Sequence, residues 1–511
     1  RETTLSNHFK IVRQIIYISL LFLLIAPAVT GQDTRIIWQK SIGGVGYDRI
    51  NDIITDEAGD AYVLSTVQVT NNHEVQVSKV SEDGDFIWTQ TIGGERDDRG
   101  HKLLLDSNGD LLILGESNSK NLQGQSTNGS LDIVVIRLSL EGDVKNVHMY
   151  GGSKFEQAAS ILQKPDGNYI VTGTTLSNDF DVTANNGQAD VWLIELDLQG
   201  NLLWEKTHGG VDDEWAVNTK LMADGSLITV SSTSTYQGDY SDNRGDADVA
   251  LYHTTAFGDL LWKRLYGGFM ADYPADLEIL SNGHFLVGAN TYSNDGDIPS
   301  NNGGQDALLM EIDQDGELIG AQTYGSFGND RIAAIEPKGE GYVIFGSSNS
   351  ASINAAVGNG SQDFWMYEIN SNKEVVHQYL FGASGFDEGV TFSLGQDGSV
   401  IMGGESNSND GMVGSNMGKN DGWLLKVNSN FDPNASEASV HPNPSNGIVY
   451  INELQEGAEL SLSNMQGAPI NNSVTPYGTS RILDLSAQPT GVYFLQAVYP
   501  DRKEVHRIVR N

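Results

Sequence analysis

The sequence predicts an all-β protein, a seven-bladed β-propeller followed by a small C-terminal β-sandwich domain. One phrase, an apolar strand that ends in Gly-Gly or a variant of it and then a carboxylate, occurs seven times in the 511 residues. Each copy belongs to a unit with signals for four short strands and none for a helix. A closed ring of such units leaves few strand edges exposed, which favours a propeller.

The first glycine of each phrase sets the period. Consecutive copies are 50, 58, 58, 58, 58 and 57 residues apart. The glycines are Gly43, Gly93, Gly151, Gly209, Gly267, Gly325 and Gly382. A fixed period of this length is typical of repeat architectures, and seven units predict seven blades.

The unit that starts at Gly151 shows the order of the strands. An apolar-alternating run reaches the turn at Asp166-Gly167, and a β-rich run leaves it, which predicts a hairpin. A polar loop (176–188) precedes a third strand (190–197), and a second turn leads to the Trp strand of the next phrase.

The two ends of the repeat array predict how the ring closes. The array opens on a Trp strand (36–42) and stops on a third-type strand (421–428). We therefore expect the first strand to complete the last blade. In the first unit the segment 67–80 replaces the long polar loop, so the rim there should be less covered.

The N-terminus has the features of an export signal. Lys10 and Arg13 precede an apolar run (15–28) and the small-residue stretch APAVTGQ, which predicts a signal peptide at 1–31. The run is too short for a membrane span, so we expect no integral membrane segment after signal cleavage. Cysteine is absent, which excludes disulfides and a lipid attached through Cys.

Composition excludes one class of partner. The net charge is −37, from 30 basic and 67 acidic residues, and such a surface repels nucleic acid. It keeps the protein soluble, and it is compatible with cations or basic surfaces as partners.

Two sets of carboxylates recur in every unit. One stands five residues after the first glycine: Asp48, Asp98, Glu156, Glu214, Asp272, Asp330 and Asp387. The other opens the third strand: Glu74, Asp132, Asp190, Asp248, Asp306, Asp363 and Asp421. The favoured interpretation is structural, with each carboxylate accepting backbone hydrogen bonds in a Gly-rich loop. The alternative is that the first set forms a ring near one mouth of the channel and binds Ca²⁺ or a cationic ligand.

Tryptophans also recur at equivalent positions, which favours a core between blades over a sugar-stacking platform. Trp215 has no counterpart in the other copies and follows Glu214 in its loop. It is therefore the first candidate for ligand contact. We find no catalytic motif such as HExxH or GxSxG, no Cys nucleophile and no complete calcium loop. The sequence thus predicts no catalytic residues, no metal ligands and no cofactor, with Ca²⁺ left as an alternative.

The tail differs from the repeats. The segments VHPNPSNGIVYI, AELSLSNMQGAPI, ILDLSAQPTGVYFLQAVY and the ending DRKEVHRIVRN follow a polar linker. In this order they resemble the C-terminal type A sorting domain of the Bacteroidetes type IX secretion system. The residues that match its motifs are Pro442, Asn443, Pro444, Gly447, Gly467, Gly491, Val492 and Tyr493. The resemblance implies the type IX machinery as a partner and export to the cell surface or the medium. The repeats are similar to arrays in uncharacterised exported bacterial proteins, which implies the propeller fold alone.

These observations predict four regions: a signal peptide (1–31), a propeller (32–430), a linker (431–439) and a sorting domain (440–511). The favoured function is a secreted or surface-displayed binding or adhesion module for an unknown extracellular glycan or protein. An exported polysaccharide- or peptide-degrading enzyme and a purely structural surface component are the alternatives. An enzyme should break the repeat at places that converge in space. From the sequence the breaks look diffuse, centred on the polar loops.

Overall fold

The structure of the protein is a computed structural model. It describes residues 36–237, 240–349, 352–353, 356–357, 360–413 and 416–428 of the repeat array, and residues 439–441, 448–452, 459–464, 469–470, 474–477, 480–498 and 503–510 of the tail. The predicted signal peptide, most of the predicted linker and the motif residues Pro442, Asn443, Pro444, Gly447 and Gly467 lie outside these residues. The described residues form strands and no α-helix, and nothing among them is a helix that could cross a membrane.

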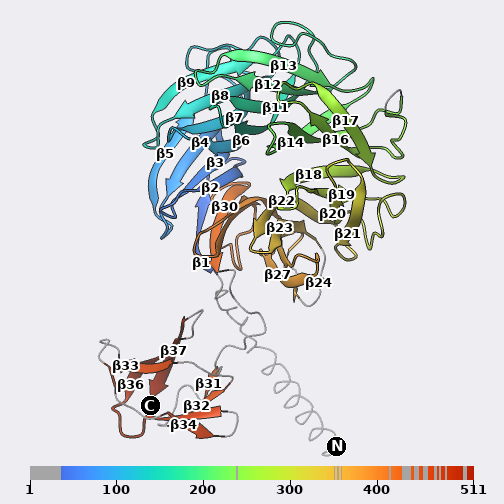
Figure 1. The fold of residues 1–511 in the computed structure, drawn as a ribbon. Helices are drawn as coiled ribbons and strands as arrows, with labels where there is room; N and C mark the ends of the chain where they lie inside the picture. The colour runs from blue at the N-terminus through green and yellow to red at the C-terminus, as the bar shows by residue number, and fades with distance from the viewer. Residues whose placement is uncertain are drawn as a thin grey trace, which may run out of the picture. The chain divides into compact units, whose positions relative to one another are not determined.

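Seven four-stranded antiparallel sheets are arranged in a ring around a common centre (Figure 1), and we number them as blades in chain order. Blade 1 contains β2 (Arg49–Thr55), β3 (Ala61–Val69), β4 (Asn72–Val80) and β5 (Phe86–Ile92). Blade 2 contains β6 (Asp98–Leu105), β7 (Leu111–Ser117), β8 (Asp132–Leu138) and β9 (Val144–Tyr150). Blade 3 contains β10 (Glu156–Gln163), β11 (Tyr169–Thr175), β12 (Asp190–Leu196) and β13 (Leu202–His208).

The remaining blades repeat this order. Blade 4 contains β14 (Glu214–Leu221), β15 (Leu227–Thr233), β16 (Asp248–Thr254) and β17 (Leu260–Tyr266). Blade 5 contains β18 (Asp272–Ile279), β19 (Phe285–Thr291), β20 (Asp306–Ile312) and β21 (Leu318–Tyr324). Blade 6 contains β22 (Asp330–Lys338), β23 (Gly341–Ser348), β26 (Asp363–Ile369) and β27 (Val375–Phe381), with the short pair β24 (Ser352–Ile353) and β25 (Ala356–Val357) between β23 and β26. Blade 7 contains β28 (Asp387–Leu394), β29 (Ser399–Ser406), β30 (Asp421–Asn428) and β1 (Ile36–Ile42).

The ring closes through its first strand. β1 pairs antiparallel with β30, and Ile42 lies opposite Gly422. The first seven described residues thus form the outermost strand of blade 7, although β30 follows almost 400 residues later. This confirms both the seven-bladed propeller and the closure that the sequence predicts.

The first strand of every blade is its innermost strand and lies nearest the centre of the ring. Each of these strands contacts the first strands of its two neighbours, and Figure 1 shows β2, β6, β14, β18 and β22 around the centre. Because the strands alternate in direction, the Gly-Gly loops and the long polar loops lie together at one face, which we call the Gly-Gly face. The tight turns lie at the opposite face, which we call the turn face.

The tight turns are one residue longer than a two-residue hairpin loop. In blade 4 the Gly225 N–H donates to Met222 O at 3.0 Å, and the Met222 N–H donates to Ser226 O at 2.8 Å. Gly225 has φ +87°, the left-handed conformation in which a side chain is strained. A turn closed by a left-handed glycine therefore stands where the sequence suggests a two-residue loop.

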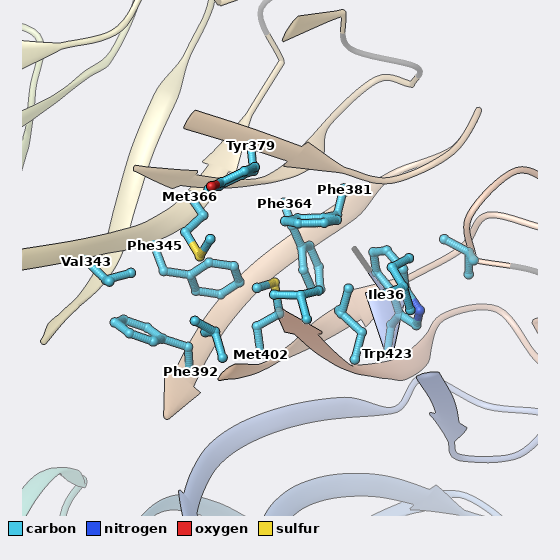
Figure 2. Packing of buried hydrophobic residues seen from close by; sticks show 14 of the residues in the cluster. Ile36, Val343, Phe345, Phe364, Met366, Tyr379, Phe381, Phe392, Met402 and Trp423 are labelled. Atoms are coloured by element: carbon cyan, nitrogen blue, oxygen red, sulfur yellow. The ribbon is translucent and has the colours of Figure 1, made fainter. Parts of the chain in front are cut away.

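Hydrophobic side chains fill the space between neighbouring blades. Figure 2 shows the cluster between blades 6 and 7, where the rings of Phe364 and Trp423 lie 4.7 Å apart and Ile36 of the closing strand joins the cluster. Trp192, Trp365 and Trp423, which occupy equivalent positions in three blades, are fully buried. These tryptophans stabilise the ring by burying large apolar surfaces between sheets.

Two tryptophans of the outermost strands hold the turns of the next blade by hydrogen bonds. The Trp38 indole N–H donates to Glu82 O at 2.8 Å, and the Trp88 indole N–H donates to Leu140 O at 3.0 Å. A Cβ on Gly84 would lie 2.7 Å from the Trp38 ring. The recurring Trp and the recurring turn glycine thus fit each other across the blade boundary.

The described part of the tail forms two small antiparallel sheets. One contains β31 (Ser439–His441), β32 (Ile448–Asn452), β35 (Ser480–Asp484) and β34 (Val474–Tyr477), and the other contains β33 (Glu459–Asn464), β36 (Gly491–Val498) and β37 (Lys503–Arg510). Val449 and Leu483 of the first sheet and Leu462, Leu495 and Ile508 of the second belong to one buried cluster. Two sheets with a shared core agree with the predicted sandwich. Of the motif residues, Gly491, Val492 and Tyr493 begin β36.

Candidate functional site

The first set of carboxylates is buried and bonded within its own blade. In every copy the carboxylate accepts a backbone N–H from the residue four positions earlier, at 2.5 to 2.9 Å. The second oxygen of Glu156 and of Glu214 accepts a hydroxyl, from Thr175 at 2.8 Å and from Thr233 at 2.6 Å. These contacts hold the Gly-Gly loop at the start of the innermost strand. Ligand binding by Asp48, Asp98, Glu156, Glu214, Asp272, Asp330 and Asp387 stays a prediction.

The second set of carboxylates lies beside the first. A Cβ on Gly209 would lie 2.1 Å from Asp190 Oδ1 and 2.7 Å from Glu214 Oε2, so only a glycine fits between the two side chains. Burial, with a further contribution from the neighbouring carboxylate, raises the pKa of Asp190 to about 6 and that of Asp248 to about 7. One oxygen of each of these two aspartates has no hydrogen-bond partner. Each Gly-Gly loop thus packs between two acidic groups that repel each other when both are charged.

The residue that follows each first-set carboxylate lies at the start of the innermost strand, near the Gly-Gly face. We call this the ring position. Its occupants are Arg49, Arg99, Gln157, Trp215, Tyr273, Arg331 and Glu388. All seven are at least partly exposed. Trp215, the candidate ligand contact, lies here, with its ring 6.4 Å from that of Phe155.

Two further positions face the same mouth. Every innermost strand has a register shift near its start, and the extra residue defines the bulge position: Asn51, His101, Ala159, Val217, Ala275, Ala333 and Val390. The residue of the second strand that lies opposite the ring position defines the partner position: Thr66, Glu116, Thr174, Ser232, Asn290, Ser347 and Glu405.

The partner position joins neighbouring blades. Thr66, Thr174 and Ser347 each accept a backbone N–H from the innermost strand of the next blade through their hydroxyl groups, at 2.9 to 3.3 Å. Glu116 accepts the corresponding N–H from Ala158 at 3.0 Å. A hydroxyl group is therefore sufficient to accept the backbone N–H of the next blade. The joining of blades does not require a carboxylate at Glu116.

Departures from the repeat converge on one cavity at the mouth. A cavity of about 380 Å³ between blades 7, 1, 2 and 3 is lined by Arg49, Asn51, Arg99, His101, Glu116, Gln157 and Glu405, among others. Both polar residues of the bulge position and both glutamates of the partner position are in this set. The short β3–β4 hairpin of blade 1, which replaces the long polar loop, contributes His73 to the same wall. Several breaks of the repeat thus lie together in this cavity, although along the sequence they look diffuse.

Two polar atoms of the cavity wall are buried without a hydrogen-bond partner. They are Nε of Arg49, a donor, and Oδ1 of Asn51, an acceptor. Arg49 reaches Glu388 and Glu405 only at 3.9 and 3.8 Å, which is beyond hydrogen-bond distance. Since buried polar groups are almost always satisfied, these two atoms leave hydrogen-bonding capacity unused in side chains that line the cavity.

The cavity also contains an imidazole held by a carboxylate. His101 Nε2 lies 3.1 Å from Glu116 Oε1, and Glu116 is only 4% exposed. On the other side of the cavity, burial raises the pKa of Glu405. This arrangement can bind polar groups, and the His101 imidazole can accept a proton.

Aromatic side chains are exposed on the other half of the Gly-Gly face. Phe269 and Phe327, at the tips of the Gly-Gly loops that lead into blades 5 and 6, are 75% and 96% exposed. Tyr273 is also exposed, at the ring position of blade 5. The corresponding loop-tip residues Glu95, Ser153 and Ser384 are polar, and Val45 and Val211 are apolar but not aromatic. Aromatic loop tips thus occur only at blades 5 and 6. We call blades 4 to 6 the aromatic side of the mouth, and blades 7, 1 and 2, which provide most of the polar cavity wall, its polar side.

We find no candidate metal centre in the described part of the chain, where no three His, Cys, Asp or Glu side chains are grouped to hold an ion. The segment DSNGD (106–110), whose acidic and amide side chains are spaced like part of a calcium-binding loop, is a turn. There Asp106 accepts the backbone N–H groups of Asn108 and Asp110, and its other oxygen lies 2.8 Å from Arg137.

Trp215 is a candidate from the sequence and stays a prediction, whereas His101, Glu116, Asn51 and Arg49 become candidates only from the structure. In the sequence, His101 is one of several histidines that occupy different positions within their repeat units. The signal was present in the register: the bulge position holds Ala or Val in five blades and Asn or His in two. It became visible only when the register shifts assigned residues to that position.

Comparison with known proteins identifies the tail. Residues 439–511 match the family described as the secretion system C-terminal sorting domain. This confirms the resemblance to the type IX sorting domain. The chain is therefore a β-propeller protein that the type IX machinery exports to the cell surface or the extracellular space.

The repeat region is similar to proteins of varied name. The regulatory protein FlaEY of Caulobacter vibrioides is 27% identical over 255 residues, which cover 47% of this chain but only 24% of that protein. Drosophila Plexin A, solved in complex with Semaphorin 1b, matches with a TM-score of 0.47 and 9% identity over 88% of this chain and 96% of that one. The polysaccharide lyase Uly1 matches with a TM-score of 0.44 and 10% identity over 79% and 94%. These likenesses transfer no activity to this chain.

Proposed function

We propose that the exported propeller binds a carbohydrate in the cavity between blades 7, 1, 2 and 3. The free donor of Arg49 and the free acceptor of Asn51 support this most directly. A hydroxyl group both donates and accepts, so the hydroxyl groups of a sugar can pair with donors such as Arg49 and with acceptors such as Asn51. The volume of about 380 Å³ suits a small polar unit better than a folded protein surface.

The composition of the wall agrees with a polyhydroxylated ligand. Arginine, asparagine, glutamine, histidine and glutamate side chains converge there, and they offer both donors and acceptors. The neighbouring carboxylates Glu388 and Glu405 balance the charge of Arg49, so the wall has no strong preference for an ionic ligand.

The repeat itself provides variants that the fold accepts. Alanine occupies the bulge position of blades 3, 5 and 6 and glutamine the ring position of blade 3, so Asn51→Ala and Arg49→Gln should leave the ring intact. The exported protein is screened on an array of neutral and acidic polysaccharides and of proteins. Each variant should weaken binding about tenfold. The charge control is Arg264→Gln, on the exposed outermost strand β17. Failure to bind any polysaccharide, or binding to proteins only, overturns the proposal.

A second candidate is an exported polysaccharide-degrading enzyme. The observation that favours it is the His101–Glu116 pair, because an imidazole oriented by a buried carboxylate is a suitable general base. Incubation of the protein with the polymer that it binds, followed by measurement of new chain ends, tests this candidate. Turnover that His101→Ala abolishes would establish it, and unchanged polymer would leave a binding protein.

A further inference from the structure

The aromatic side of the mouth is not needed to build the propeller. The ring position holds Trp215 and Tyr273 in blades 4 and 5, but arginine, glutamine or glutamate in the other five blades. At the loop tips, Phe269 and Phe327 occupy positions that are serine in the loops leading into blades 3 and 7. Since the same backbone forms with polar residues there, folding does not explain these four aromatic side chains.

Exposure of these rings to water is unfavourable, and the two most exposed aromatic side chains among the described residues, Phe327 and Phe269, are in neighbouring Gly-Gly loops. Phe327 is 96% exposed and Phe269 is 75% exposed, although the chain is strongly acidic and otherwise soluble in character. Tyr292, next to the end of β19, and Tyr236, in the polar loop of blade 4, add exposed aromatic surface to the same blades. A group of exposed aromatic side chains on one face marks a binding surface.

The aromatic side continues directly from the cavity. Around the mouth, Gln157 of the cavity wall is followed by Trp215 in the next blade and then by Tyr273. Neighbouring first strands are in contact here, β10 with β14 and β14 with β18. A chain that leaves the cavity past Gln157 therefore meets Trp215 first and Tyr273 next.

We propose that the ligand is a polysaccharide long enough to leave the cavity and cross an aromatic track formed by Trp215, Tyr273, Phe269 and Phe327. The inference rests on the proposed carbohydrate function and names the polymer as the ligand class. Sugar rings present flat C–H faces that stack on aromatic rings, whereas their hydroxyl groups point to the side. The polar cavity holds one end unit by hydrogen bonds, and the track holds the following units by stacking.

The polymer differs from a protein partner in how its affinity depends on length. A bound chain gains a stacking contact for each ring that it reaches, so affinity should increase from short oligosaccharides to the full polymer. Removal of each aromatic ring should cost about threefold to tenfold in affinity for the polymer. The same removal should leave the affinity for the shortest bound oligosaccharide unchanged, because that ligand occupies the cavity alone.

The experiment uses the exported protein and residues that the repeat already accepts. The track variants are Trp215→Gln, Tyr273→Gln, Phe269→Ser and Phe327→Ser, singly and together, and the cavity variant is Asn51→Ala. The control is Phe257→Ser, which removes a 66% exposed ring from a turn on the turn face. Probes are the array-selected polysaccharide and a ladder of its oligosaccharides, measured by calorimetry.

Four results decide the inference. Loss of polymer affinity in the track variants, with oligosaccharide affinity retained, supports it, and the cavity variant should then lose both. Track variants that bind the polymer like the parent protein overturn the track while the carbohydrate function stands. An affinity for oligosaccharides that does not increase with their length also overturns the proposed aromatic track. Absence of binding to any oligosaccharide or polymer overturns the proposed function as well.

Discussion

His101 Nε2 lies 3.1 Å from Glu116 Oε1, and the same Glu116 oxygen accepts the backbone N–H of Ala158 in the next blade. One carboxylate therefore performs the joining role that hydroxyl groups perform at Thr66 and Thr174 and also orients an imidazole in the cavity. The structural and functional parts of this contact can be separated, because the repeat shows which side chain is sufficient for the first.

Replacement of Glu116 by threonine should remove the support of His101 but keep the joining hydrogen bond. We expect the melting temperature to change by less than about 2 °C, since threonine occupies this position in blades 1 and 3. Affinity for the carbohydrate should fall about tenfold. Calorimetric melting and binding measure the two effects. Glu116→Leu provides the contrast, because it leaves the Ala158 N–H unsatisfied and should cost about 1–3 kcal/mol of stability. Equal stability of the two variants would contradict the joining role that we assign to the side chain at position 116.

Asp272 and Tyr273 are adjacent but should respond in opposite ways. Asp272 accepts the Gly268 N–H at 2.8 Å and the Ser293 hydroxyl at 2.9 Å, and it is fully buried. Asp272→Ala leaves two buried donors unsatisfied and should cost about 2–4 kcal/mol in urea unfolding. Tyr273→Gln should leave the unfolding midpoint unchanged and weaken polymer binding. If Asp272→Ala loses binding without losing stability, the repeated carboxylates contact a ligand, as the alternative interpretation of the sequence holds.

Two turn glycines separate backbone strain from packing. Gly84 (φ +87°) and Gly109 (φ +78°) both have the left-handed conformation, so alanine should cost about 1–2 kcal/mol at either site. At Gly109 an added Cβ meets open space, whereas at Gly84 it would lie 2.7 Å from the Trp38 ring of the closing strand. Gly84→Ala should therefore cost a further 1–3 kcal/mol, roughly. Denaturant unfolding of both variants measures the difference, and equal costs would show that the Trp38 contact adds no stability.

Much of the architecture could be predicted from the sequence because its causes are local and repeated. The strands, the turn glycines and the carboxylates recur at one period, so each copy supports the interpretation of the others. The closure by 36–42 followed from where the array begins and ends. The cavity could not be predicted in this way, because its residues are exceptions to the repeat. Asn51, His101, Glu116 and Glu405 come from three blades, and only the closed ring brings the first and the last of them together.

Stability should increase as the pH falls from about 8 to about 5. Burial raises the pKa of Asp132, Asp190 and Asp306 to about 6, and it raises the pKa of Glu74 and Asp248 to about 7. The ordinary values are 3.8 for Asp and 4.5 for Glu. The folded state therefore binds these protons more tightly than the unfolded state does. Their contribution to stability is complete below the ordinary values and is lost as the pH rises through about 6 to 7.

Neutral variants of the same groups test the origin of this dependence. Asp190→Asn and Asp248→Asn remove one charge from a buried pair, so each should flatten the rise in unfolding midpoint between about pH 8 and pH 5. The control is Asp410→Asn, on a fully exposed loop, where the Ser384 N–H lowers the pKa of the carboxyl group. That group titrates below this range in both states, so the control should keep the slope of the parent protein. A parent midpoint that falls from pH 8 to pH 5 would show that the paired carboxylates are not protonated in the folded ring, and the repulsion across each Gly-Gly loop would then have to be offset by other contacts.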